Sequence, residues 1–162
     1  MMRRFPWILR YAGAIWLLAF LSLAVADDRF TDNGDGTVTD RQNHLMWAAT
    51  DNQGDIDWRQ ADRWVRYTLP DTLAVPYTDW RLPTLEELKS IYVEDPAYAG
   101  YLTDCGMRVR IIPQIRLSCG WVWTAQQQSI SAWGFHFNRG IRIKDRMVLK
   151  KGYRALAVRN IQ

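Results

Sequence analysis

The chain has 162 residues, with 21 lysines and arginines against 17 acidic residues, which gives a formal net charge of +4. With 48% hydrophobic and 23% charged residues, it is too apolar for a disordered chain. Positions 1–26 hold three arginines and no acid, so residues 27–162 carry a net charge of only +1. This balance excludes a histone-like polycation, and 136 residues fit a single domain with one core.

The first 26 residues have the pattern of an export signal. A cationic segment, residues 1–10, precedes an uncharged run over residues 11–26, which ends in the small-x-small sequence Ala24-Val25-Ala26. The run is shorter than the about 20 residues that a spanning helix needs. We therefore predict a cleaved signal peptide, no stable membrane span, and export to the periplasm, the cell surface or the medium. An uncleaved N-terminal anchor is the alternative.

Export makes the two cysteines, Cys105 and Cys119, interpretable. An oxidising compartment favours a disulfide, which closes a loop of about 15 residues and is worth about 3 kcal/mol. Two sulfurs with no other ligand nearby in the sequence form a poor zinc site, so we predict neither a metal nor a cofactor. Two free thiols or a redox pair are the alternatives.

The predicted mature chain divides by the sign of its charge. Residues 27–104 hold 16 acids and 7 bases, whereas residues 105–162 hold 11 bases and a single acid, Asp145. No linker composition or internal repeat separates the halves. We therefore predict one domain, residues 27–162, in which the acidic and basic halves pack together.

The first half of this domain predicts a hairpin and two helices. Asn-Gly and Asp-Gly within residues 33–36 favour a turn between two strands, and Leu45-Met46-Trp47 predicts a third strand. Asp57 is a candidate N-cap for a helix from Trp58, and Thr84 with Glu87 forms a second capping box. The proline-containing segment 69–83 is expected to be a loop.

After Cys119 the hydrophobic pattern alternates with a period of two. Strands are predicted over residues 121–124, around residues 133–137, from residue 141 onward and over residues 153–159. Two early helices and a late antiparallel sheet predict the α+β class.

Several segments resemble the Legionella collagen-like protein C-terminal domain family, long filed as a domain of unknown function. The most specific is Asp79-Trp80-Arg81-Leu82-Pro83 with the helix start that follows it. The others are Phe30–Asp40 with Leu45–Trp47, Trp123–Ala125, Trp133–Phe135 and Arg154–Arg159. The resemblance covers roughly residues 29–159 and implies a compact fold similar to C-type lectin and formylglycine-generating-enzyme domains. It implies an exported surface or adhesion module, and it supplies no catalytic residues.

The chain also departs from this family pattern. Many members place one cysteine in the first helix and another just before the final Val-Arg, where this chain has Trp64 and Ala157. The loop before Asp79 is also longer than the resemblance leads one to expect. We expect a local link between Cys105 and Cys119 in place of the family cross-link.

Two acidic or charged motifs have a structural interpretation that we favour. The aspartates of residues 32–40 resemble a calcium loop, but EF-hand spacing places Thr31 and Gln42 where acids are required, so hairpin turn chemistry is preferred. In the Asp79–Pro83 motif, Trp80 and Leu82 are expected to enter the core, leaving Arg81 to pair with Glu87 or Asp79.

The candidate binding residues lie in the second half. Arg142, Lys144 and Arg146 alternate with other residues, so they share a face if the strand continues. Seven tryptophans follow residue 26, and Trp121, Trp123 or Trp133 is expected to supply an aromatic contact on a recognition surface. Trp121 and Trp123 share one face of their strand, and Trp133 is expected to extend the same layer. Compensation of the basic face by the acidic half is the alternative interpretation.

These features favour an exported, non-enzymatic binding or adhesion module for a glycan or another anionic surface polymer. Nucleic acid is not expected as a partner, because export places the protein in the wrong compartment. The alternatives are an oxidase of the formylglycine-generating type that uses Cys105 and Cys119, or a structural subunit of the cell envelope. The sequence does not specify an oligomeric state.

Overall fold

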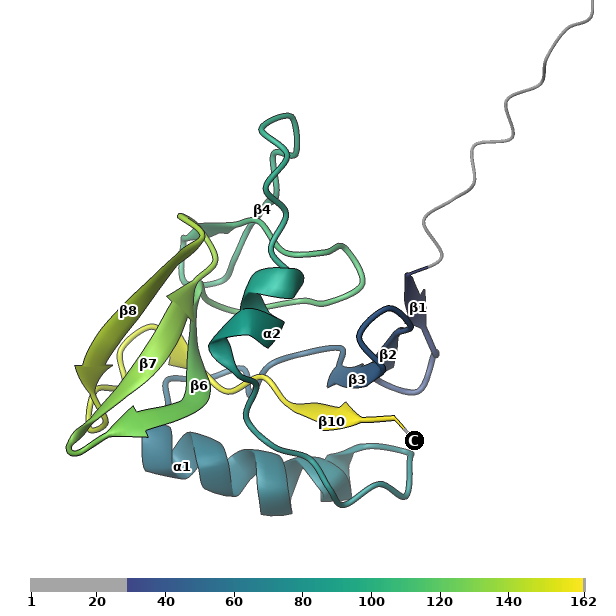
Figure 1. The fold of residues 1–162 in the computed structure, drawn as a ribbon, viewed down its shortest axis with the longest axis horizontal. Helices are drawn as coiled ribbons and strands as arrows, with labels where there is room; N and C mark the ends of the chain where they lie inside the picture. Colours follow the sequence, from purple (N-terminus) through teal and green to yellow (C-terminus); the bar gives the residue numbers. More distant parts are fainter. Residues whose placement is uncertain (1–28, 162) are drawn as a thin grey trace, which may run out of the picture.

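A computed structural model describes residues 29–161 of the chain. The predicted signal peptide over residues 1–26 lies outside the described residues and stays a prediction. The described part is of the mixed α+β class, with two helices and mostly sheet, as the sequence predicts (Figure 1).

The first sheet joins the start of the domain to its end. β1 (Phe30–Asp32), β2 (Thr37–Asp40), β3 (Leu45–Ala48) and β10 (Val158–Asn160) form an antiparallel sheet in that order. Gly34 and Gly36 adopt positive φ angles of 73° and 86°, which the turn between β1 and β2 requires. The predicted hairpin and third strand are confirmed. Because β10 pairs with β3, the last strand closes the sheet that the first residues begin.

The first helix begins where the sequence predicts and ends later. α1 (Trp58–Arg63) starts after Asp57, whose carboxylate accepts a hydrogen bond from the Gln60 amide. The helical path then continues through a π-helical segment, Trp64–Thr68, and a 3-10 turn, Leu69–Thr72. The expectation of a loop from residue 69 is therefore wrong for its first four residues. Proline at the first or second position of this turn is tolerated, because the amide it lacks would be unpaired there.

The second helix, α2 (Leu85–Ser90), has the predicted capping box. The Thr84 hydroxyl accepts a hydrogen bond from the Glu87 amide, and the Glu87 carboxylate accepts one from the Thr84 amide. Beyond this helix, β4 (Tyr101–Leu102) and β5 (Arg108–Val109) form a short two-stranded sheet.

The second sheet contains the late strands. β6 (Trp121–Gln128), β7 (Ser131–His136) and β8 (Ile141–Arg146) form an antiparallel meander, and β9 (Tyr153–Arg154) pairs with β6 in parallel. The single strand expected over residues 153–159 is thus divided between the two sheets. Residues 155–157 run between the two sheets and are fully buried.

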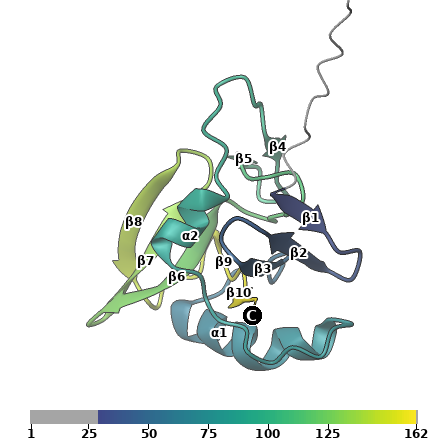
Figure 2. The same ribbon diagram turned by 45° about the vertical axis from the view of Figure 1, so that its right-hand side comes forward.

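The two helices pack on different sides of the second sheet (Figure 2). Phe135 of β7 belongs to the hydrophobic cluster that contains Leu88 of α2. Trp123 of β6 belongs to a second cluster, with Ala61 of α1. These clusters fill the interior of the described unit, so residues 29–161 contain a hydrophobic core of their own.

Candidate functional site

The outer strand of the second sheet exposes the three basic residues that the sequence places on one face. Arg142, Lys144 and Arg146 alternate along β8, and all three are exposed to solvent. Their partners in register on β7 are Phe135, Trp133 and Ser131. Residues directly opposite each other in an antiparallel pair project from the same side of the sheet. The predicted sharing of one face is therefore confirmed.

Trp133 lies under two of these cations. The Arg142 guanidinium carbon is 5.3 Å from the centroid of the Trp133 indole, and the Lys144 ammonium nitrogen is 5.8 Å from it. Both distances lie within the range of a cation–π contact. Trp133 is only half-buried, and it lies on the same face of β7 as Phe135, the face on which α2 packs. We call Trp133, Arg142, Lys144 and Arg146 the basic face.

Trp123 does not belong to this surface. It is opposite Gly134 in the β6–β7 pair, so it projects from the other side of the sheet from Trp133. Its side chain is fully buried, stacks on Tyr153 with ring centroids 3.8 Å apart, and donates a hydrogen bond to the Ile56 carbonyl. The expectations that Trp123 contacts a ligand and that Trp133 extends its layer are wrong.

The acidic and basic halves of the chain do pack together. Within residues 29–161, four ion pairs join a carboxylate of the first half to a cation of the second. The pairs are Asp51–Arg154, Asp55–Arg154, Asp57–Lys150 and Asp79–Arg159, with distances of 3.9, 2.7, 3.6 and 2.6 Å. Carboxylates of the acidic half therefore neutralise some cations of the basic half, but not all of them.

The basic face lies outside this compensation. Arg142, Lys144 and Arg146 form no ion pair with any residue between 29 and 161. The acid nearest in sequence, Asp145, faces the opposite side of β8 and accepts a hydrogen bond from the Tyr153 hydroxyl at 2.6 Å. Three unneutralised charges therefore follow one exposed strand.

The Asp79–Pro83 motif is architectural, as predicted. Trp80 and Leu82 are 1% exposed and belong to the second hydrophobic cluster, whereas Pro83 leads into the capping box of α2. The Arg81 guanidinium contacts both carboxylate oxygens of Glu87, at 2.9 and 2.7 Å. Of the two partners considered for Arg81, Glu87 is therefore the one found, because Asp79 is held by Arg159.

This ion pair lies beside a groove of about 630 Å³. Burial favours the neutral carboxyl of Glu87, but hydrogen bonds from Arg81 and Thr84 outweigh it, so the pKa of Glu87 falls below its usual value. Arg81 also donates to the Asn160 side chain, which connects the motif to β10. Three of the side chains that line the groove, Arg81, Glu87 and Asn160, are therefore joined by hydrogen bonds to one another.

A buried polar cluster was not predicted from the sequence. Asp51 is 2% exposed and accepts hydrogen bonds from the Ser118 amide and hydroxyl at 2.7 and 2.9 Å. Arg154 donates to the Ser118 hydroxyl at 2.6 Å and to Asp55 at 2.7 Å. The two aspartates are close in the chain, but every other pair of residues in this cluster is separated by 36 to 103 positions. No local spacing in the sequence therefore indicates the cluster.

The two cysteines form the predicted disulfide. Cys105 and Cys119 are joined by an S–S bond of 2.06 Å, with Cα atoms 5.3 Å apart. The disulfide lines a cavity of about 460 Å³ together with Trp121 and Tyr153. In this bonded form neither sulfur is a thiolate, so the redox chemistry of the oxidase alternative requires reduction first.

The aspartates of the first hairpin serve its turn. Asp32 accepts a hydrogen bond from the Gly34 amide, and Asp35 accepts one from the Thr37 amide. Over residues 29–161, no three His, Cys, Asp or Glu side chains gather as a metal site. No helix in that range has the length and apolarity to cross a membrane.

The two positions at which the family pattern has cysteines, Trp64 and Ala157, lie in or against one hydrophobic cluster. Trp64 packs against the cluster that contains the fully buried Ala157, so both positions without cysteine meet in one apolar region.

A search among curated proteins finds no match to this chain. The model of the Lcl C-terminal domain matches residues 36–159, which include both helices and all strands from β2 to β9. The chain therefore belongs to the Lcl C-terminal domain family.

Proposed function

We propose that this domain is an exported, non-enzymatic binding or adhesion module whose ligand is an anionic polymer, such as a sulfated or phosphorylated glycan. The observation that carries the proposal is the basic face. Its three cations remain without carboxylate partners among the described residues, although ion pairs neutralise other cations of the same half.

The geometry of a strand suits a repeating anion. Alternate residues on one face of a strand lie about 6.8 Å apart, so the face offers charges at regular intervals along a line. Guanidinium and ammonium groups bind sulfate and phosphate oxygens through charge-assisted hydrogen bonds. The half-buried indole of Trp133 adds an apolar surface on which a sugar ring can stack.

A competing interpretation is that these cations protect the edge of the sheet. β8 is the outermost strand of its sheet, and charged side chains on edge strands prevent pairing with other chains. Glutamates protect an edge in the same way, whereas they repel an anionic polymer. Substitution by glutamate therefore separates the two interpretations.

The test is retention on immobilised heparin, a sulfated glycan, with residues 27–162 as the protein. Arg142→Glu/Lys144→Glu should elute at much lower salt than the unsubstituted protein and remain monodisperse. Arg63→Glu/Lys89→Glu makes the same change in net charge at exposed helix positions. It should lose only the retention that follows from net charge, and should therefore elute at a clearly higher salt concentration than the first variant. Equal retention of the two variants would refute the assignment of the basic face.

We also infer that the fold is similar to C-type lectin domains and that the chain is exported. The pairing of β10 with β3, which brings the end of the domain back to its beginning, supports the first inference. The Cys105–Cys119 disulfide supports the second, because such bonds persist in oxidising compartments. Signal cleavage after Ala26, measured by N-terminal sequencing of the secreted protein, tests the export.

A further inference from the structure

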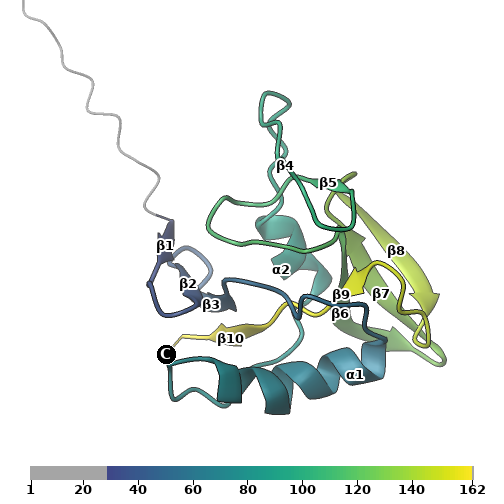
Figure 3. The same cartoon turned by 180° about the vertical axis from the view of Figure 1, so that it is seen from behind.

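Two neighbouring loops at one end of the second sheet expose aliphatic side chains. Ile130 in the β6–β7 turn is 65% exposed, and Val148 and Leu149 in the loop after β8 are 69% and 42% exposed. The Met147 amide donates a hydrogen bond to the Ile130 carbonyl at 3.0 Å, so the loops are held side by side. Both lie at the same corner of the molecule in Figures 1 and 3. We call Ile130, Val148 and Leu149 the apolar tip.

The position of Ile130 is unusual for its residue type. Only Ser129 and Ile130 connect β6 to β7, and Ser129 has a positive φ of 56°. Such two-residue turns favour glycine, asparagine and aspartate, which tolerate the backbone and the solvent. The β-branched side chain of Ile130 does not stabilise such a turn, and it is not buried within the domain.

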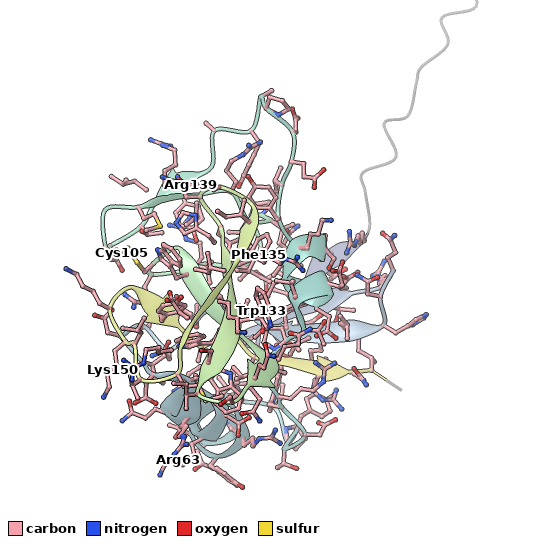
Figure 4. All side chains as sticks on the ribbon, turned by 60° about the vertical axis from the view of Figure 1, so that its left-hand side comes forward. Arg63, Cys105, Trp133, Phe135, Arg139 and Lys150 are labelled. Carbon is pink, nitrogen blue, oxygen red and sulfur yellow. A yellow bond between two sulfur atoms is a disulfide. The ribbon has the colours of Figure 1, made fainter. Side chains whose placement is uncertain are left out.

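Cations surround the apolar tip. Arg146 and Arg59 line a hollow of about 250 Å³ together with Ile130 and Val148. Lys150 and Lys151 follow directly after Leu149, and Figure 4 shows Lys150 at the periphery of the molecule. Three acids lie near this end, but Asp57 pairs with Lys150, Asp55 pairs with Arg154, and Asp145 accepts a hydrogen bond from Tyr153. Within residues 29–161, the cations Arg59, Arg146 and Lys151 therefore remain without an ion-pair partner.

We propose that the apolar tip docks on the surface of an anionic lipid bilayer. Aliphatic side chains bind at the boundary between headgroups and acyl chains, and each contributes about a tenfold gain in partitioning. Basic residues near an anionic surface add to this binding, and long lysine side chains keep their charge among the headgroups. A protein partner would satisfy the aliphatic groups, but the cations on more than one side of the tip match a continuous anionic surface.

The basic face and the apolar tip are separate surfaces that share only the neighbourhood of Arg146. Lipid docking through the apolar tip therefore does not require a polymer bound at the basic face. Docking through the tip would leave Trp133, Arg142 and Lys144 on the side of the sheet, where a polymer remains able to reach them.

The test is co-sedimentation of residues 27–162 with vesicles of phosphatidylglycerol and phosphatidylcholine. We expect binding that falls about tenfold or more in Ile130→Ser/Val148→Ser, a change that removes apolar surface without altering charge. Leu102→Ser is the matched control, because Leu102 is 62% exposed on β4, away from the tip, and it should bind as the unsubstituted protein does. No binding to these vesicles, an unchanged double variant, or an equal loss in the control would overturn the proposal.

A second measurement remains informative even if the double variant folds poorly. Both native cysteines are in the disulfide, so Val148→Cys provides a single reactive thiol for an environment-sensitive fluorophore. The emission of this label should shift to the blue when the anionic vesicles are added, whereas the same label at Leu102→Cys should not respond. A label at position 148 that stays in water on bound protein would refute docking through the tip.

Discussion

The interaction between Glu87 and Arg81 predicts a measurable loss of stability when the carboxylate is removed. Glu87 accepts two hydrogen bonds from Arg81 and one from the Thr84 amide, and its side chain is only 17% exposed. Loss of a capping interaction costs about 1 kcal/mol, and a partly exposed two-point ion pair contributes about 1–2 kcal/mol. Glu87→Ala should therefore lower the free energy of unfolding by about 2–3 kcal/mol.

The measurement is urea unfolding followed by tryptophan fluorescence, with thermal unfolding as a second readout. The expected loss corresponds to a fall in Tm of about 8 °C for a domain of this size. Glu86→Ala is the matched control, because Glu86 is the exposed neighbour in the same turn of α2 and removes the same charge. It should cost only about 0.5 kcal/mol through the helix dipole. Similar losses in the two variants would refute the role assigned to the Arg81 pair.

The pH dependence of this difference checks the electrostatic part. The pKa of Glu87 is held below its usual 4.5, so its contribution is complete above the unfolded pKa and is lost as the pH falls through the folded value. The stability difference between the unsubstituted protein and Glu87→Ala should therefore be largest near neutral pH. It should shrink as the pH falls below the ordinary carboxyl pKa of 4.5 and through the lower pKa of folded Glu87. A difference that stays constant over this range would show that the loss is one of packing alone.

Two further predictions concern the cysteines and the tryptophans of the second sheet. Alkylation of the unreduced protein should modify no thiol by mass, and Cys105→Ser/Cys119→Ser should lower the free energy of unfolding by about 3 kcal/mol; a modified thiol would revive the oxidase hypothesis. Trp123→Ala should cost about 3–5 kcal/mol in urea unfolding because the side chain is fully buried, whereas Trp133→Ala should cost about 1 kcal/mol yet weaken heparin retention; equal costs would contradict their placement on opposite faces.

The features predicted correctly from the sequence are those set by nearby residues. The caps at Asp57 and Thr84 need only a side chain and an amide three residues later, so local spacing is enough to identify them. The same holds for the turn between β1 and β2, where glycine supplies the positive φ. The disulfide followed from a count of two cysteines and a predicted compartment.

The features predicted wrongly depend on residues far apart in the chain. The side of the sheet on which Trp133 lies is set by its register with β6, which shifts at an irregularity between Trp123 and Gln127. The alternation of hydrophobic residues within β7 shows which side chains share a face, but it does not show which residues of β6 lie on that same face. In the same way, Asp51 meets Ser118 across 67 residues, so their hydrogen bonds leave no periodic signal.

The β3–β10 pairing has a consequence for how this domain matures. β3 lies between β2 and β10, so its second edge stays open until the last strand of the chain arrives. The sheet can therefore close only when Trp47 and its neighbours pair with Val158–Asn160, which lie more than 100 positions later in the chain. A chain truncated before Val158 would expose an unpaired hydrophobic strand edge, the kind of surface on which aggregation begins. The domain therefore reaches its protected, fully paired state only when residues 158–160 are in place.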